Sequence, residues 1–124
     1  MAEEKNSNYE KKLRELLDFY VHKVYDCTES FPKSEIFGLT SQFRSAALSV
    51  VLNYIEGYVR RRDKVFLNFL EISYGSLMES RYLIDFSLKR KLISLKDRED
   101  LIKVSNEVGA MLWGIIRKIE KFKE

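Results

Sequence analysis

The residue types that most often carry catalysis are scarce in this chain. Among its 124 residues there is one histidine, His22, and one cysteine, Cys27. A cysteine nucleophile needs a base beside it, and no recognisable motif pairs these two residues. One cysteine and one histidine also supply neither a disulfide nor the usual zinc or di-iron ligands. Because a glycine-rich phosphate loop and a serine nucleophile elbow are lacking too, the sequence predicts a non-catalytic protein without metal or cofactor.

Polar residues follow one side of an otherwise apolar segment, mostly at the four-residue spacing of a single helix face. They are Arg44, Ser45, Ser49, Asn53 and Glu56, and Glu79 lies among small residues further along the chain. Because a buried charge is costly unless it is paired, we expect Arg44 to pair with Glu79 or Glu56. The set Arg44, Asn53, Glu56 and Glu79 then forms either a ligand pocket or a structural network that fixes helix register or lines a subunit interface. The absence of an accompanying histidine or metal-ligand set favours the structural network.

Basic residues gather in two places. Arg60, Arg61, Arg62 and Lys64 lie together near the middle of the chain, directly after Tyr58. Such a cluster can bind phosphates, and a tyrosine beside it can stack on an unpaired base. A second group comprises Lys89, Arg90, Lys91, Lys96 and Arg98. Cations also suit the C-terminal ends of helices, so either group is alternatively an ordinary solvated helix end.

The elements that position these residues are predicted to be helices. Hydrophobic residues make up 45% of the chain, which contains one proline and five glycines. This composition supports a folded core with few helix breakers. Apolar residues recur every three or four positions in four segments, at about 7–29, 39–60, 64–89 and 95–122. Turns are expected near Pro32–Gly38, Arg61–Asp63 and Lys91–Leu95.

Short turns between long helices favour antiparallel neighbours, so we expect one domain, residues 1–124, that folds as an all-α, up-down-up-down four-helix bundle. Three helices with a separate tail satisfy the pattern less completely. In the bundle, the turn after Arg60 shares an end with both termini, which brings Arg117, Lys118 and Lys121 near the basic cluster. The longest uncharged stretch, Ser45–Ile55, is too short to span a membrane, and the charged N-terminus does not resemble a secretory signal. We therefore expect a soluble, cytoplasmic protein.

Several segments together resemble one family, the four-helix-bundle proteins that include the 23S rRNA intervening-sequence proteins. The resemblance rests on residues 31–33 (Phe-Pro-Lys), 38–47 (from Gly-Leu-Thr-Ser-Gln to Ala-Ala), 53–58 (Asn-Tyr-Ile-Glu-Gly-Tyr) and 75–79 (Gly-Ser-Leu-Met-Glu). It implies a small bacterial up-down bundle that assembles as a homopentamer around a central channel. A structural relative, the accessory protein of diversity-generating retroelements, implies binding to nucleic acid and to a reverse transcriptase. The chain departs from the family pattern at Tyr54, Ile55 and Val59, where smaller residues are usual.

Two functions from different classes follow. The first is a non-catalytic oligomer that binds RNA or DNA through Arg60, Arg61, Arg62, Lys64, Arg117, Lys118 and Lys121. The second is an oligomeric scaffold that binds another protein and no nucleic acid, favoured by a net charge of only +3 and by aromatic-rich helix faces. Helix 39–60 is apolar on opposite sides, and a lone bundle buries chiefly one stripe per helix. We therefore expect a homo-oligomer under either hypothesis.

Overall fold

The computed structural model describes the backbone of residues 2–123 and the side chains of residues 8–121. It contains four long helices: α1 (Ala2–Thr28), α2 (Leu39–Arg60), α3 (Asp63–Lys89) and α4 (Leu95–Lys123). A short 3-10 helix, η1 (Lys33–Glu35), precedes α2, and the described backbone contains no strand. The predicted all-helical fold is confirmed. Helix α2 begins and ends at the predicted residues, whereas α1 begins five residues earlier than expected.

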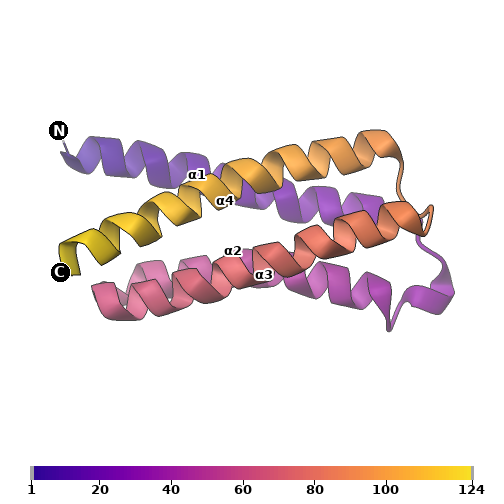
Figure 1. The fold of residues 1–124 in the computed structure, drawn as a ribbon, viewed down its shortest axis with the longest axis horizontal. Helices are drawn as coiled ribbons and strands as arrows, with labels where there is room; N and C mark the ends of the chain where they lie inside the picture. The colour runs from indigo at the N-terminus through magenta and orange to yellow at the C-terminus, as the bar shows by residue number, and fades with distance from the viewer. Residues whose placement is uncertain (1, 124) are drawn as a thin grey trace.

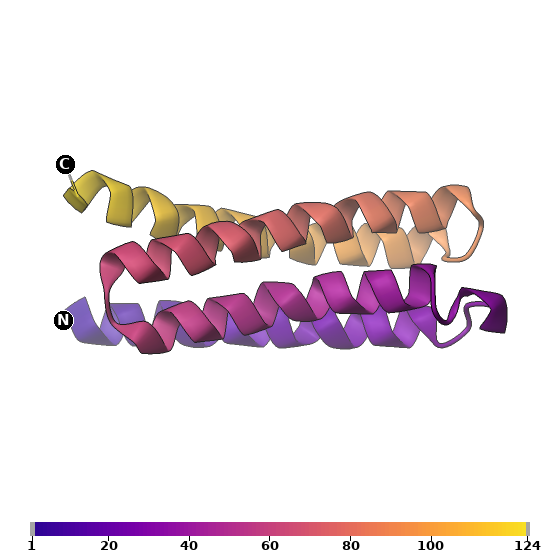
Figure 2. The ribbon, with the colours of Figure 1, turned by 90° about the horizontal axis from the view of Figure 1, so that it is seen from below.

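The helices form a bundle in which each packs against two others. Helix α1 lies beside α2 and α4, and α3 also lies beside α2 and α4. Figures 1 and 2 show that successive helices run in opposite directions. Both ends of the described chain therefore lie at the same end of the bundle as the α2–α3 turn, which we call the terminal end. Helix η1 and the α3–α4 turn lie at the opposite end, called the η1 end.

The core consists of the apolar stripes that the helical periodicity predicts. Its largest fully buried side chains are Leu13, Leu17, Tyr20, Val24, Phe43, Val50, Tyr54, Leu70, Leu77, Ile84, Leu101 and Leu112. Removal of this apolar surface from water is the main stabilising contribution to such a fold. None of the described helices has a stretch that is both long and apolar enough to cross a lipid bilayer.

Serines fix how the helices sit against one another. The hydroxyls of Ser49 on α2 and Ser76 on α3 lie 2.7 Å apart, and Ser73 donates to the Val50 carbonyl at 2.6 Å. Across the core, the Tyr20 and Ser80 hydroxyls lie 2.7 Å apart. Burial of Tyr20 raises the pKa of its phenol to about 12, so the hydroxyl stays protonated and available as a donor. These bonds satisfy the hydroxyl and carbonyl groups that the packing of α3 against α2 and α1 buries.

The α2–α3 turn is unusually tight. Only Arg61 and Arg62 separate the helices, and Arg61 has φ 60°, in the left-handed region that residues other than glycine rarely adopt. Gly57, one turn earlier, lets the helices meet, because an added Cβ would lie 2.7 Å from the Phe69 Cβ. At the α3–α4 turn, the Ser94 hydroxyl accepts a 3.0 Å bond from the Asp97 amide and so caps the start of α4.

Candidate nucleic-acid interface

The seven predicted nucleic-acid-binding residues all belong to segments at the terminal end. Arg60, Arg61, Arg62 and Lys64 lie at the α2–α3 turn, and Arg117, Lys118 and Lys121 lie in the last turns of α4. All seven are exposed. Arg60 forms an ion pair with Glu56 and lies 5.8 Å from the centre of the Phe69 ring. The other six cations are exposed and form no ion pair with any residue of the described range 8–121.

An aromatic cleft of about 640 Å³ lies at the terminal end, and Lys118 is the member of the seven cations that lines it. Its walls come from all four helices. Tyr9 and Glu10 belong to α1, Tyr54 and Tyr58 to α2, and Asp63 and Phe66 to α3. Helix α4 contributes Gly114, Ile115, Lys118 and Ile119. The lining thus contains apolar surface, two carboxylates and one cation. The sequence identifies Tyr58 as a stacking residue but does not reveal the cleft, because residues so far apart in the chain have no shared spacing.

Inside the cleft the aromatic rings hold one another in place. The rings of Tyr54 and Tyr58 lie 5.9 Å apart, and that of Phe66 lies 6.1 Å from Tyr58 in an edge-to-face arrangement. The Arg14 guanidinium lies 5.4 Å from the centre of the Tyr58 ring. Burial raises the pKa of the Tyr54 phenol, whereas the Tyr58 side chain remains 45% exposed. Tyr58 is therefore a braced ring that still offers surface for stacking.

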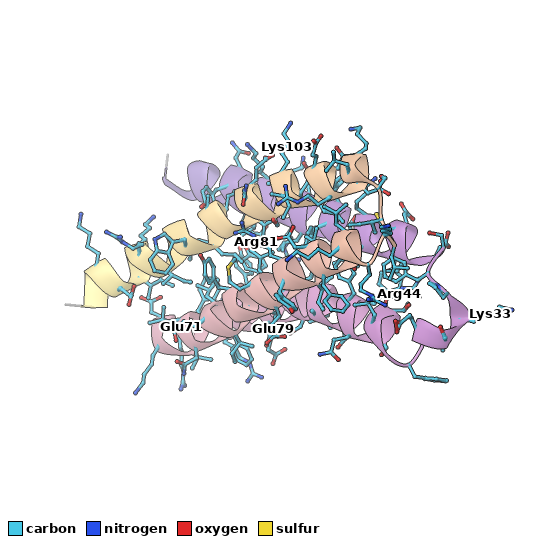
Figure 3. All side chains as sticks on the ribbon, turned by 45° about the vertical axis from the view of Figure 1, so that its right-hand side comes forward. Lys33, Arg44, Glu71, Glu79, Arg81 and Lys103 are labelled. Atoms are coloured by element: carbon cyan, nitrogen blue, oxygen red, sulfur yellow. The ribbon has the colours of Figure 1, made fainter. Side chains whose placement is uncertain are left out.

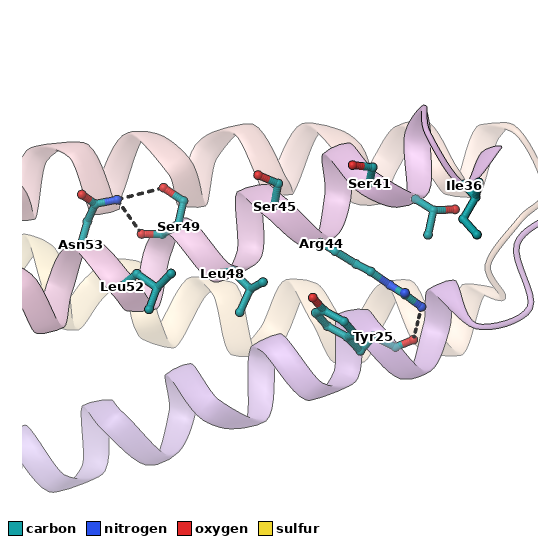
Figure 4. Close-up of a pocket in the computed structure, with 10 residues that line it drawn as sticks. Tyr25, Ile36, Ser41, Arg44, Ser45, Leu48, Ser49, Leu52 and Asn53 are labelled. Atoms are coloured by element: carbon teal, nitrogen blue, oxygen red, sulfur yellow. Dashed lines mark hydrogen bonds between the residues drawn. The ribbon is translucent and has the colours of Figure 1, made fainter.

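The predicted polar network is not one network, and the expected partner of Arg44 is wrong. Figure 4 shows the Arg44 guanidinium directed toward α1 and Tyr25. Its Nε donates to the Thr28 hydroxyl at 2.7 Å, and its guanidinium lies 4.5 Å from the centre of the Tyr25 ring. The physical reason is rotation about the helix: Arg44 lies on the α1 side of α2, whereas Glu79 is exposed on α3.

The remaining members have local partners. Glu56 pairs with Arg60, four residues later in the same helix. Asn53 donates from Nδ2 to both the Ser49 carbonyl and the Ser49 hydroxyl, each at 2.9 Å. Because Ser49 also bonds Ser76, this part of the set does link α2 to α3. Arg44, Ser49 and Asn53 line a shallow groove of about 560 Å³ on the outer surface of α2.

The second basic group, at the η1 end, is more fully neutralised. Arg98 pairs with Asp85 at 3.0 Å, and Lys96 pairs with Asp100 at 2.8 Å. Hydrogen bonding to Lys96 lowers the pKa of the Asp100 carboxyl, so this ion pair persists at neutral pH. Only Lys89, Arg90 and Lys91 remain there without an ion-pair partner in the range 8–121. The terminal end is therefore the more strongly positive surface.

The two residues first considered for catalysis lie in different environments. His22 is exposed on α1, with Nε2 3.5 Å from an Asp18 carboxylate oxygen. Cys27 is buried, and burial raises the pKa of its thiol to about 11. In the part of the chain with described side chains, no three His, Cys, Asp or Glu residues gather as they would around a metal ion.

Comparison with known proteins is consistent with the bundle. A crystal structure of a protein of unknown function from the S23 ribosomal protein family of Bacteroides thetaiotaomicron aligns with a TM-score of 0.77 and 17% sequence identity. The alignment covers 84% of this chain and 97% of that one, and at such identity it shows a shared fold alone. Comparison with curated proteins finds no match. The family model of the 23S rRNA-intervening sequence protein matches residues 8–114. Since this match spans most of the sequence and all four helices, the chain belongs to the 23S rRNA-intervening sequence protein family.

Proposed function

We propose that this protein is a non-catalytic homo-oligomer that binds RNA or DNA through its terminal end. The observation that carries the proposal is the group of exposed cations at the terminal end, chiefly Arg61, Arg62, Lys64 and Lys118, of which Lys118 also lines the aromatic cleft. Each can displace a counterion from a phosphate, and this release supplies most of the affinity of sequence-independent binding. The name of the family, 23S rRNA-intervening sequence protein, also supports a nucleic-acid partner. A nucleic-acid partner is compatible with a bacterial cytoplasmic protein, and we propose that origin and location for this chain.

The contacts expected from this surface go mainly to the phosphate backbone. Such contacts position a strand without reading its sequence, so we expect weak sequence preference. The Tyr58 ring offers a platform for one unpaired base, and stacking of this type contributes about 1–3 kcal/mol. Single-stranded nucleic acid should therefore bind more tightly than a duplex of the same length.

Assembly is part of the proposal because one chain carries only a small net charge of +3. A cyclic oligomer repeats the terminal end of each chain and so builds a ring of positive charge. Exposed apolar side chains support assembly: Leu52 is 59% exposed and Tyr82 is 69% exposed. The family resemblance points to five chains.

A salt titration with a labelled single-stranded RNA tests the nucleic-acid proposal. The variant Arg60→Ala/Arg61→Ala/Arg62→Ala should bind at least about tenfold more weakly near 0.1 M salt, for every RNA sequence tried, with a shallower salt dependence. The matched control, Lys89→Ala/Arg90→Ala/Lys91→Ala, removes three cations from the η1 end and should bind as the wild type does. Weakening in the control alone would move the site to the η1 end.

The alternative is a protein-binding scaffold without nucleic-acid affinity. The observation that favours it is a hollow lined by Phe37, Tyr82 and Phe86, which are 96%, 69% and 38% exposed. A group of exposed aromatic side chains is typical of a surface that another protein covers. Absence of RNA and DNA binding by the wild type at low salt would favour this scaffold and overturn the nucleic-acid proposal.

A further inference from the structure

Helix α2 presents a strip of small side chains along its outer surface. Ser41, Ser45 and Ser49 recur at four-residue spacing and form the floor of the 560 Å³ groove (Figure 4). Leu48 and Leu52 rise along one side of this floor, and Leu52 is 59% exposed. We call these five residues the α2 strip. Small residues between larger apolar ones make the holes into which side chains of another helix fit.

Helix α3 presents a second outer surface, in which large side chains lie on both sides of a gap at Gly75. Ile72, Gly75, Glu79, Tyr82 and Phe86 recur in alternating steps of three and four residues, and we call them the α3 stripe. Ile72 is 51% exposed, Tyr82 69% and Phe86 38%. This spacing is that of a helix seam that packs against another helix. Within one chain nothing covers the stripe at Gly75, where an added Cβ would meet no atom within 4 Å.

The two surfaces match in height along the bundle. The bond from Ser73 to the Val50 carbonyl marks one level on both helices. Glu79 lies six residues after Ser73, and Arg44 lies six residues before Val50. Because the helices are antiparallel and rise about 1.5 Å per residue, both residues lie about 9 Å from that level in the same direction. Counted in the same way from Ser73 and Val50, Gly75 lies at the height of Leu48 along the bundle. Ile72 lies within one residue of the height of Leu52.

The level pairs are complementary in size and charge. The bulky Leu48 is level with the bare backbone of Gly75, and the apolar Leu52 is level with the apolar Ile72. The cation Arg44 is level with the anion Glu79. Neither of these two forms an ion pair with any residue of its own chain between 8 and 121. Figure 3 shows them on separate helices, Arg44 on α2 and Glu79 on α3.

We propose that the α3 stripe of one chain packs onto the α2 strip of a second copy, with Glu79 of the first chain paired to Arg44 of the second. The inference rests on the proposed homo-oligomer and names the surfaces that build it. Rotation about an axis parallel to the bundle changes no residue's height, so level residues meet between neighbours. Because two different surfaces join, the contact is head-to-tail, and it gives a ring when the rotation between neighbours closes. All terminal ends then lie on one side of the ring.

A two-fold dimer is the competing arrangement for these surfaces. A two-fold axis across the bundle reverses the heights of the second chain, so Arg44 no longer meets Glu79. A two-fold contact also brings each surface patch against its own copy or exchanges both patches at once. The two arrangements therefore predict different cross-links.

Cross-linking of single-cysteine variants distinguishes them. In a Cys27→Ala background, which removes the native thiol, Leu48→Cys and Gly75→Cys are made in separate chains. Under mild oxidation the mixture should give a covalent dimer that neither variant gives alone, since the proposed contact joins position 48 to position 75. The double variant Leu48→Cys/Gly75→Cys should give covalent species larger than a dimer, because each chain is joined to two neighbours, whereas a two-fold contact that exchanges both patches stops at the dimer. The control mixture, Leu48→Cys with Phe19→Cys on α1, should stay uncross-linked. Covalent dimers of either variant alone would overturn the proposal.

A charge exchange tests the ion pair, with the mass in solution measured by light scattering. Arg44→Glu and Glu79→Arg should each lower the mass toward 14.7 kDa, the mass of one chain, and the double variant should restore the wild-type mass. A helix signal equal to that of the wild type shows that each variant is folded. An oligomeric wild type that gives no mixed cross-link would overturn this inference and leave the proposed assembly standing. A monomeric wild type would overturn both.

Discussion

Arg44 shows which properties of a single residue the sequence pattern predicts and which it does not. Its place in a polar line next to apolar positions predicts correctly that it is not freely solvated. The periodicity does not say which neighbour it meets, because that depends on the rotation of α2 against α1. Thr28 and Tyr25, which the guanidinium contacts, lie in the preceding helix and have no charge to signal the pairing. Partners of a half-buried cation can be neutral, and a search for carboxylates alone misses them.

We expect Arg44→Ala to lower the free energy of unfolding by about 1–2 kcal/mol. The substitution removes the 2.7 Å bond to Thr28 and the contact with the Tyr25 ring. The matched control, Arg61→Ala, removes an exposed cation and should change the same quantity by less than about 0.5 kcal/mol. Urea unfolding followed by circular dichroism measures both. Equal, small losses would show that the contacts of Arg44 contribute nothing to stability.

Cys27 provides a second prediction at this scale. Its side chain is 7% exposed, and burial raises the thiol pKa to about 11. Only the thiolate reacts with a disulfide reagent, and at pH 7.5 a group of that pKa is almost wholly protonated. We expect Ellman's reagent to label the folded protein at least about a hundredfold more slowly than the protein in 8 M urea. Comparable rates in the two conditions would place the thiol at an accessible surface.

At the scale of elements, the sequence predicts most of what the structure shows. The four helices and their order follow from three- and four-residue periodicity and from the single proline, because tertiary packing and local preference agree along the whole chain. The ends are less predictable. The residue before α2 is Gly38 and the residue before α3 is Arg62, and neither side chain caps its helix. Without the serine, threonine, aspartate or asparagine that usually marks a helix start, the sequence does not show where these two helices begin.

Gly57 is the element-scale position with the largest expected effect. Its added Cβ would lie 2.7 Å from the Phe69 Cβ and 2.9 Å from the Phe66 Cδ1, so α2 and α3 would have to separate. We expect Gly57→Ala to cost about 1–3 kcal/mol of unfolding free energy. Gly109→Ala is the control, since its nearest atom is a Leu77 methyl at 3.3 Å. A loss in the control as large as in Gly57→Ala would show that helix contact is not the cause.

At the scale of the whole molecule, the cleft could not be predicted from the sequence, because it joins residues from all four helices and no spacing along the chain connects them. The α2 strip and the α3 stripe each have helical spacing, but nothing along the chain shows that the two surfaces match. The basic end was predictable because topology alone places the α2–α3 turn beside the end of α4. The sequence predicts apolar surface on opposite sides of helix 39–60. It does not predict that exposed residues of α2 and α3 lie at matching heights, because that depends on the register shown by the hydrogen bonds of Ser49, Ser73 and Ser76.

The last prediction joins assembly to nucleic-acid binding. A tryptophan at Gly75 meets no atom of its own chain within 4 Å at its Cβ, yet it would fill the space proposed for Leu48 of the neighbour. Gly75→Trp should therefore fold normally and have the mass of one chain, 14.7 kDa, in light scattering. One chain offers only its own cations at the terminal end, whereas the ring offers those of every copy to one strand. Because the slope of log affinity against log salt grows by about 0.7 for each phosphate contact on a single strand, the variant should show both weaker binding and a shallower slope. A labelled 40-nucleotide RNA titrated at several salt concentrations measures the two quantities together. If the single-chain variant binds with the affinity and slope of the wild type, assembly has no part in binding, and the terminal end of one chain is sufficient.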